Sequence, residues 1–138
     1  MRIGADYYPE HWEKERWKTD AEMMVKANIK VIRIGEFAWS LYEPEEGKYE
    51  FDWMDEALDF FGKYGIKVVM CTPSATPPKW MIDKYPDILQ NDIHGNPKLF
   101  GTRKHYCFNS ETYREKTKKL NTLIAKRYAK HPAIEAWQ

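Results

Sequence analysis

Hydrophobic and polar residues follow two different periods along the chain, and these periods alternate. Short apolar stretches bounded by glycine, proline or polar residues predict four strands, at residues 1–8, 29–34, 66–71 and 133–138. Apolar residues at three- and four-residue spacing predict three main helices, at residues 13–27, between Asp52 and Gly65, and between Ser110 and His131. This order, β-α-β-α-β-α-β, predicts parallel strands joined by right-handed helical crossovers.

Residues typical of helix ends support these boundaries. Asp52 and Ser110 can each accept a hydrogen bond from the first turn of a helix, and Gly65 suits the left-handed position that follows a helix. Two long loops, at residues 36–51 and 72–109, follow the second and third strands. The second of these loops contains a proline-initiated segment that predicts a short helix from residue 78 to residue 84.

Two architectures built from parallel strands compete. A doubly wound sheet normally carries a glycine-rich phosphate loop after its first strand, but residues 7–12 read YYPEHW and the chain contains no such motif. In a (β/α)8 TIM barrel, long polar and aromatic loops follow the carboxyl ends of the strands, as they do here. Because a complete barrel needs about 250 residues, we predict an α/β fold in which residues 1–138 form the N-terminal half of a (β/α)8 barrel, truncated at the fourth strand.

The charge balance argues against two classes of partner. The chain has 22 Lys and Arg against 21 Asp and Glu, with both signs interleaved, so we expect neither nucleic acid nor an anionic membrane as partner. No apolar run approaches the ~18 residues of a membrane span, and the first residues lack the apolar core of a signal peptide. Together with two cysteines that form no CxxC pair, this predicts a cytoplasmic protein.

Aromatic residues make up 15% of the chain, and many lie in the loops after strands beside ionisable residues. In a barrel these loops converge on one rim. The rim candidates are Asp6, Tyr7, Tyr8, Glu10, His11, Trp12, Glu36, Phe37, Trp39, Tyr42, Trp80, Arg103, His105 and Cys107. Since Trp12, Trp53 and Trp80 lie on or beside predicted helices, we expect them in the core, and we expect the glutamates of residues 43–46 in a solvated turn.

Several candidates have a structural explanation as well as a functional one. Glu36 follows a strand directly and either faces a substrate or holds an arginine in place. Arg103 has five N–H donors, which suit vicinal sugar hydroxyls, a carboxylate or a salt bridge. Glu10 and His11 can act chemically or brace the first loop. Cys107 lacks three further nitrogen or sulfur ligands nearby, so a closed zinc site is not expected within this chain and a buried thiol is the default.

Five ordered motifs resemble the N-terminal part of glycoside hydrolase family 42 β-galactosidases. They are GADYYPEHW at residues 4–12, RIGEFAWS at 33–40, EPEEG at 43–47, TPPKW at 76–80 and RKHYCFNS at 103–110. The resemblance covers essentially the whole chain. It implies a (β/α)8 barrel that cleaves terminal non-reducing β-D-galactosides with retention, without a catalytic cofactor, usually within a homotrimer.

The resemblance also implies roles for individual residues. Arg103 matches an arginine that binds galactose, and Glu36, Phe37 and Trp39 match the loop near that cleft. Cys107 matches the first of four cysteines that hold a structural zinc in some members, so zinc is expected only in a full-length parent protein.

No catalytic residue is assigned within the chain. The resemblance places the general acid/base just after the strand that contains Gln138 and the nucleophile in a later strand, so we expect residues 1–138 to be inactive alone. Glu135 precedes the expected position and is not assigned as a substitute. Two other hypotheses stay open: a carbohydrate-binding or self-associating half-barrel module, and a retaining glycosidase specific for another sugar.

Overall fold

The computed structural model describes residues 2–101 and 104–138, which form two compact units. The first, the sheet unit, comprises Met1–Glu36, Phe51–Thr72 and Tyr128–Gln138. The second, the loop unit, comprises Phe37–Glu50 and Pro73–Arg127. None of the helices in the described part of the chain is long and apolar enough to cross a membrane.

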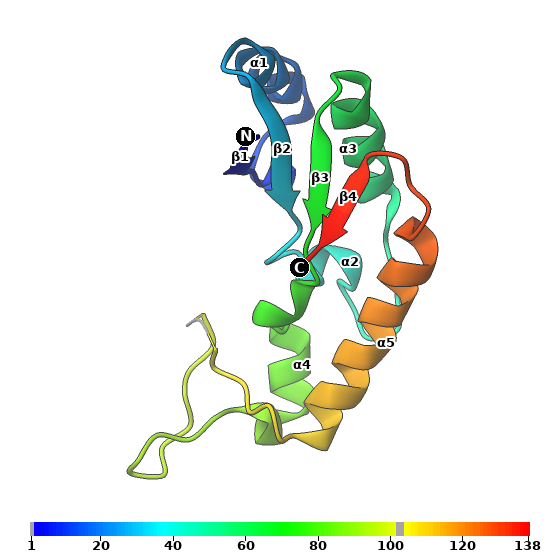
Figure 1. Cartoon of the computed structure of the whole chain (residues 1–138). Coiled ribbons are helices and arrows are strands. Elements are labelled where there is room, and N and C mark those ends of the chain that lie inside the picture. Colours follow the sequence, from blue (N-terminus) through cyan, green and yellow to red (C-terminus); the bar gives the residue numbers. More distant parts are fainter. Residues whose placement is uncertain (1, 102–103) are drawn as a thin grey trace. The chain divides into compact units, whose positions relative to one another are not determined.

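Four parallel strands form the sheet unit (Figure 1), in the order β1 (Ile3–Asp6), β2 (Ile29–Ile34), β3 (Lys67–Met70) and β4 (Ile134–Trp137). Helix α1 (Lys14–Lys26) connects β1 to β2, and α3 (Asp52–Lys63) lies between β2 and β3 in the chain. Neighbours in the sheet are neighbours in sequence, whereas a doubly wound sheet reverses its strand order near the middle. The strand order therefore favours the barrel over the doubly wound alternative.

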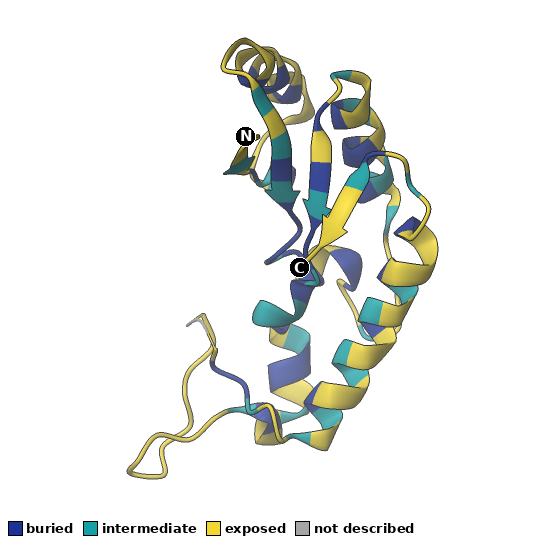
Figure 2. Ribbon diagram, in the orientation of Figure 1, coloured by how far each residue is buried: buried dark blue, intermediate teal, exposed yellow. Residues whose placement is uncertain are grey.

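Alternating burial along β2 shows which face of the sheet meets the helices. Ile32 and Ile34 are fully buried, while Val31 and Arg33, which point to the other face, are partly exposed. Buried apolar residues of α1 and α3 recur at helical spacing: Trp17, Ala21 and Met24, then Met54, Ala57, Leu58 and Phe61. Figure 2 shows buried and exposed stretches alternating along the helices. The predicted core stripe of α3 needs one correction, because Met54 and not Trp53 is fully buried.

The first turn of α3 also differs from the prediction. Asp52 is the first residue of the helix, and Phe51 occupies the capping position, where its carbonyl accepts hydrogen bonds from the amides of Met54 and Asp55 at 2.9 and 3.0 Å. The Phe51 carbonyl also accepts a hydrogen bond from the Tyr128 hydroxyl at 3.3 Å. At its other end, α3 is followed by Gly65 with φ +71°, as predicted.

The loop unit contains α2 (Trp39–Tyr42), α4 (Lys79–Lys84) and most of α5 (Glu111–Tyr128). Helix α4 confirms the short helix predicted from residue 78. Helix α2 corrects the prediction of a helix-free loop at residues 36–51. The Ser110 hydroxyl accepts a hydrogen bond from the Tyr113 amide at 3.3 Å, so the predicted cap of α5 is confirmed.

A long excursion precedes α5 within the loop unit. Single antiparallel bridges join Leu89 to Tyr106 and Asn91 to Pro97, so the described residues 89–101 and 104–106 contain segments that run side by side in opposite directions (Figure 1). At the tip, one carboxylate oxygen of Asp92 accepts hydrogen bonds from the amides of His94 and Asn96 at 2.8 and 2.9 Å. His94 is exposed in this turn.

Candidate active-site rim

An arginine at the carboxyl end of β2 organises the carboxyl edge of the sheet. The Arg33 Nε atom lies 2.7 Å from Asp6 Oδ1, and Nη2 lies 2.8 Å from Asp6 Oδ2, so the two planar groups meet along two parallel hydrogen bonds. The sheet register places Asp6 directly opposite Arg33 on the adjacent strand. This edge is where barrel enzymes carry their chemistry.

The remaining nitrogen of the same guanidinium reaches two further residues. Arg33 Nη1 lies 2.8 Å from Glu36 Oε2 and 3.2 Å from Gln138 Oε1. The Tyr8 hydroxyl lies 3.4 Å from the same Glu36 oxygen. Through one arginine the rim therefore connects the last residue of β1 with residues that follow β2 and β4. The ion pair with Arg33 gives Glu36 the role of holding an arginine, one of the two predicted for it.

The charges at this rim shift the pKa values of its members. The hydrogen bond from Arg33 lowers the pKa of Asp6, and Asp6 in turn raises the pKa of Arg33. Burial, followed by the negative charge of Glu36, raises the pKa of Tyr8. Burial also raises the pKa of the Cys71 thiol, whose sulfur lies 3.9 Å from Arg33 Nη1. The rim thus presents an ionised Asp6 carboxylate, a fixed cation and neutral O–H and S–H groups, which suit hydrogen bonding to a polar, uncharged ligand.

Within the loop unit, Phe37 and Trp39 have different environments. Phe37 lines a pocket of about 320 Å³ together with Ser40, Thr76, Pro77, Pro78, Lys79, Phe100, Gly101 and His105. Trp39 is fully buried, and its indole Nε1 donates a hydrogen bond to Glu43 Oε2 at 3.0 Å. The structure therefore places Phe37 at an open cavity and Trp39 in the packed interior.

Two expectations about structural residues are wrong. Glu43 is only 1% exposed, because its carboxylate accepts hydrogen bonds from Trp39 and from the Gly47 amide, so it does not belong to a solvated turn. Trp12 is 45% exposed rather than in the core, and the guanidinium of Arg16 lies 4.1 Å from the centre of its ring. The cation explains how this ring remains at the surface.

The structure says less about two residues predicted to bind a ligand, Arg103 for the sugar and Cys107 for zinc. Arg103 lies outside the described residues. Cys107 is half-buried and forms no disulfide, and no group of three or more His, Cys, Asp or Glu side chains able to hold a metal occurs in the described segments. The described residues therefore do not fit a zinc ion at Cys107.

Two other carboxylates, Glu135 and Glu10, were also candidates for a functional role. Glu135 is in β4 and forms an ion pair with Arg2. Glu10 has both carboxylate oxygens buried without a hydrogen-bond partner in the described part of the chain, and burial raises its pKa. The residue that the sequence reasoning missed is Arg33, although a cation between Ile32 and Ile34 near the carboxyl end of a strand was a usable signal.

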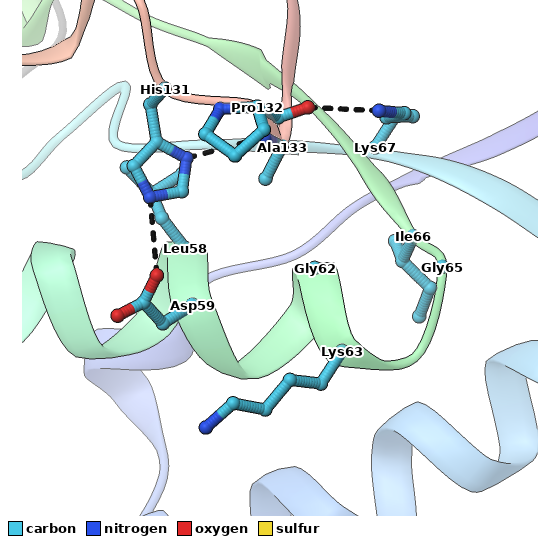
Figure 3. Close-up of a pocket in the computed structure, with 10 residues that line it drawn as sticks. All are labelled: Leu58, Asp59, Gly62, Lys63, Gly65, Ile66, Lys67, His131, Pro132 and Ala133. Atoms are coloured by element: carbon cyan, nitrogen blue, oxygen red, sulfur yellow. Dashed lines mark hydrogen bonds and ion pairs between the residues drawn. The ribbon is translucent and has the colours of Figure 1, made fainter.

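A second pocket of about 320 Å³ lies at the opposite, amino ends of β3 and β4 (Figure 3). The Lys67 amine donates to the Pro132 carbonyl at 2.8 Å, and His131 Nε2 lies 3.3 Å from Asp59 Oδ1. Gly62 of α3 faces Ala133, and a Cβ added to Gly62 would lie 3.3 Å from the Ala133 Cβ. Because residues at this end of a barrel serve stability, we place the candidate site at the carboxyl edge.

Comparison with known proteins identifies the family of the chain. The glycoside hydrolase family 42 model, described as beta-galactosidase, matches residues 6–138. The chain is 52% identical over 136 residues to a beta-galactosidase of Thermus thermophilus and 48% identical over 138 residues to beta-galactosidase BgaH of Haloferax lucentense. These alignments cover 99% and 100% of this chain but 21% of each relative.

Solved structures agree with the sequence relatives. The crystal structure of a beta-galactosidase from the psychrophilic Marinomonas ef1 superposes with a TM-score of 0.96 at 46% identity, covering all of this chain and 21% of that chain. A xylanase, XynB of Paenibacillus barcinonensis, shares the fold alone, with a TM-score of 0.59 at 22% identity. The predicted barrel architecture is confirmed, and the chain spans about a fifth of the length of the relatives it matches.

Proposed function

Because the chain belongs to glycoside hydrolase family 42, we propose that its residues form part of the substrate site of a retaining β-galactosidase acting on terminal non-reducing β-D-galactosides. The observation that carries this proposal is the rim in which Arg33 joins Asp6, Glu36 and Gln138 at the carboxyl edge of a parallel sheet. Fixed donors and acceptors at this edge suit the hydroxyl groups of a sugar.

The two reacting carboxyl groups are proposed to lie outside residues 1–138. Retaining hydrolysis requires a carboxylic acid that protonates the leaving oxygen and a carboxylate, about 5–5.5 Å away, that attacks the anomeric carbon. Glu36 is not proposed as the nucleophile: its Oε2 atom forms an ion pair with Arg33 and accepts a hydrogen bond from Tyr8, which gives it a role in holding the arginine. The residues of this chain hold and orient the sugar in the proposed mechanism, and Arg103 and Phe37 contribute a donor fork and an apolar surface.

The proposal is tested by the substrate range of the full-length protein that carries these residues. We expect it to hydrolyse nitrophenyl β-D-galactoside with a higher kcat/KM than the matching glucoside and fucoside. A higher kcat/KM for the glucoside or fucoside would favour the alternative of another sugar specificity.

Arg103 provides a residue-level test of the same site. Arg103→Ala should raise KM or lower kcat/KM for the galactoside while the protein stays folded, because the substrate loses a planar hydrogen-bond donor. Lys104→Ala is the matched control, since it removes a neighbouring positive charge from the same loop. Unchanged kinetics of Arg103→Ala would remove this residue from the site.

The isolated 138 residues are proposed to lack activity. In the described sheet, β1 and β4 each have one neighbouring strand, which favours self-association through the open edges as the alternative role of the isolated chain. Size-exclusion chromatography over a range of concentrations, with and without galactose, tests that role. Hydrolysis of nitrophenyl galactoside by the isolated chain would contradict the placement of both reacting carboxyl groups elsewhere.

Three further properties are proposed for the whole protein: a homotrimeric state, a cytoplasmic location and a structural zinc that uses Cys107. The zinc would require three additional ligands from outside this chain. Mass determination in solution and metal analysis of the full-length protein test the trimer and the zinc.

A further inference from the structure

We propose that Asp6 is a positioning residue of this rim, which fixes the Arg33 guanidinium so that Nη1 is directed at Glu36 and Gln138. The inference rests on the proposed function for its kinetic consequence, although the orientation itself is tested independently below. Asp6 does not act on substrate in this scheme and exerts its effect through Arg33.

The argument begins with the hydrogen-bond capacity of arginine. A guanidinium has five N–H donors in one plane, one on Nε and two on each Nη atom. Asp6 takes one donor from Nε and one from Nη2, which defines the plane of the group and its rotation within that plane. One donor on Nη2 and two on Nη1 remain, and the Nη1 atom lies near Glu36 Oε2, Gln138 Oε1 and, at 3.9 Å, Cys71 Sγ.

The strand register explains why Arg33 can reach so far. Arg33 lies opposite Asp6 on β1 and opposite Val69 on β3, so its side chain crosses over β3 to meet Gln138, directly after β4. One continuous chain of hydrogen bonds, Asp6 to Arg33 to Gln138, therefore spans the carboxyl edge from β1 to β4.

The backbone of Gln138 is held separately by β3. The Gln138 amide donates to the Met70 carbonyl at 2.9 Å, and the Gln138 carbonyl accepts from the Thr72 amide at 2.9 Å. The backbone is thus fixed without Arg33, and the bond from Nη1 determines where the Gln138 side chain points. Loss of Asp6 should consequently misdirect side chains at the rim while leaving the strand ladder in place.

The kinetic test uses the full-length protein with Asp6→Asn, Asp6→Ala and Arg33→Lys. Asp6→Asn is nearly isosteric but replaces one acceptor oxygen by an NH2 group that cannot accept from arginine. We expect Asp6→Asn and Asp6→Ala to lower kcat for nitrophenyl β-D-galactoside by about 10- to 100-fold, the range for misplacing site groups by about 1 Å. KM should change by less than about threefold, because Asp6 makes no contact with substrate.

Glu135→Ala is the matched control. It also removes the acidic partner of an arginine, in the ion pair between Arg2, directly before β1, and Glu135 of β4. We expect its kcat and KM to stay within twofold of the unchanged protein. In the Arg33→Lys background, Asp6→Ala should lower kcat by less than a further threefold. The planar donor fork that Asp6 orients is already absent there.

A structural measurement separates the positioning role of Asp6 from the proposed β-galactosidase function. In NMR spectra, the side-chain amide signals of Gln138 should move in Asp6→Asn and stay in place in Glu135→Ala. A protein that hydrolyses galactosides, with kcat of Asp6→Asn and Asp6→Ala within twofold of the original, would overturn the positioning role and leave the proposed function intact. Unmoved Gln138 signals in Asp6→Asn would overturn the orientation even if the protein hydrolysed no galactoside.

Discussion

The buried carboxylate of Glu43 allows a prediction whose magnitude follows from its contacts. Glu43 Oε2 accepts a hydrogen bond from Trp39 Nε1 at 3.0 Å, and Oε1 accepts one from the Gly47 amide at 2.9 Å. The Glu43 backbone carbonyl separately accepts from Trp80 Nε1 at 2.8 Å, and a side-chain substitution preserves that bond. Tyr49 is a third hydrogen-bond partner of this carboxylate. Glu43→Ala therefore removes the acceptors of three donors, on Trp39, Gly47 and Tyr49, and leaves the backbone contact unchanged.

The expected loss can be stated for one reporter, the Gly47 amide. A hydrogen bond to a charged group contributes about 1.5–3 kcal/mol. Since about 1.4 kcal/mol corresponds to a factor of ten in an equilibrium constant, exchange of the Gly47 amide with solvent deuterium should become roughly 10- to 100-fold faster in Glu43→Ala. Glu43→Gln should give a smaller effect, because its amide keeps one acceptor oxygen.

Tyr49 provides a second reporter with a defined sign. Burial, followed by the charge of Glu43, raises the pKa of Tyr49 to about 12. Removing that charge should lower the Tyr49 pKa, so phenolate should form at lower pH in Glu43→Ala, as measured by ultraviolet difference titration. Burial of the ring remains, so the pKa should stay above its ordinary value.

The assay for Gly47 is amide hydrogen exchange by NMR on the 138-residue chain, with Glu45→Ala as control. Glu45 lies two residues away, is exposed, and pairs only with Lys48 among the described residues, so its removal should change Gly47 exchange by less than about twofold. Equal Gly47 exchange in Glu43→Ala and the original chain would refute the assignment of Glu43 as a buried acceptor.

The remaining predictions concern an ion cluster and two helix ends. Hydrogen bonds from Lys116, then Lys84, lower the pKa of Glu46 to about 2. The pairing therefore stabilises the fold above the ordinary glutamate pKa and is lost as the pH falls through about 2, and Lys116→Ala should raise the Glu46 pKa in a carbon-13 NMR titration. Ser110→Ala removes the cap of α5 and should lower the free energy of unfolding, measured in urea, by about 0.5–2 kcal/mol. Gly65→Ala should lower the free energy of unfolding by about 1–2 kcal/mol, because φ is +71°. Nothing lies within 4 Å of the added Cβ, so this loss comes from backbone conformation and not from a clash.

Each of these predictions has a clear contrary result. An unchanged Glu46 titration in Lys116→Ala would show that the lysine does not hold the carboxylate. Unchanged protection of the Tyr113 amide in Ser110→Ala would exclude the cap. Gly65→Asn tolerates the left-handed conformation better than alanine does, so equal stability of the two variants would show that backbone conformation is not the cause.

Sequence patterns predict elements well where local chemistry defines both ends. Strand β2 matches its predicted bounds residue for residue, because its β-branched run lies between Asn28 with φ 56° and Gly35 with φ 85°. Helix α2 escaped prediction because its four residues provide no repeat of the helical period. The Asp52 cap was wrong because the helix begins at Asp52 itself, so the capping position falls on Phe51, whose side chain has no acceptor.

The site was predictable in position and less so in its contacts. Glu36 was expected at the end of a strand with either a substrate or an arginine as partner, and Arg33 is a partner three residues earlier. A polar residue that alternates with Ile32 and Ile34 could have been assigned to the face opposite the helices. Its bond to Gln138 depends on a contact 105 residues away in sequence, which no local pattern encodes.

The close approach of Gly62 to Ala133 has a consequence for how this family varies. A Cβ at residue 62 would lie 3.3 Å from the Ala133 Cβ, so the combined volume at these two positions is limited by the distance between α3 and the start of β4. A larger side chain at one position is tolerated only if the other becomes smaller or the helix moves outward. Across an alignment of related β-galactosidases, residues at these two positions should therefore covary, with alanine at position 62 accompanied by glycine at position 133.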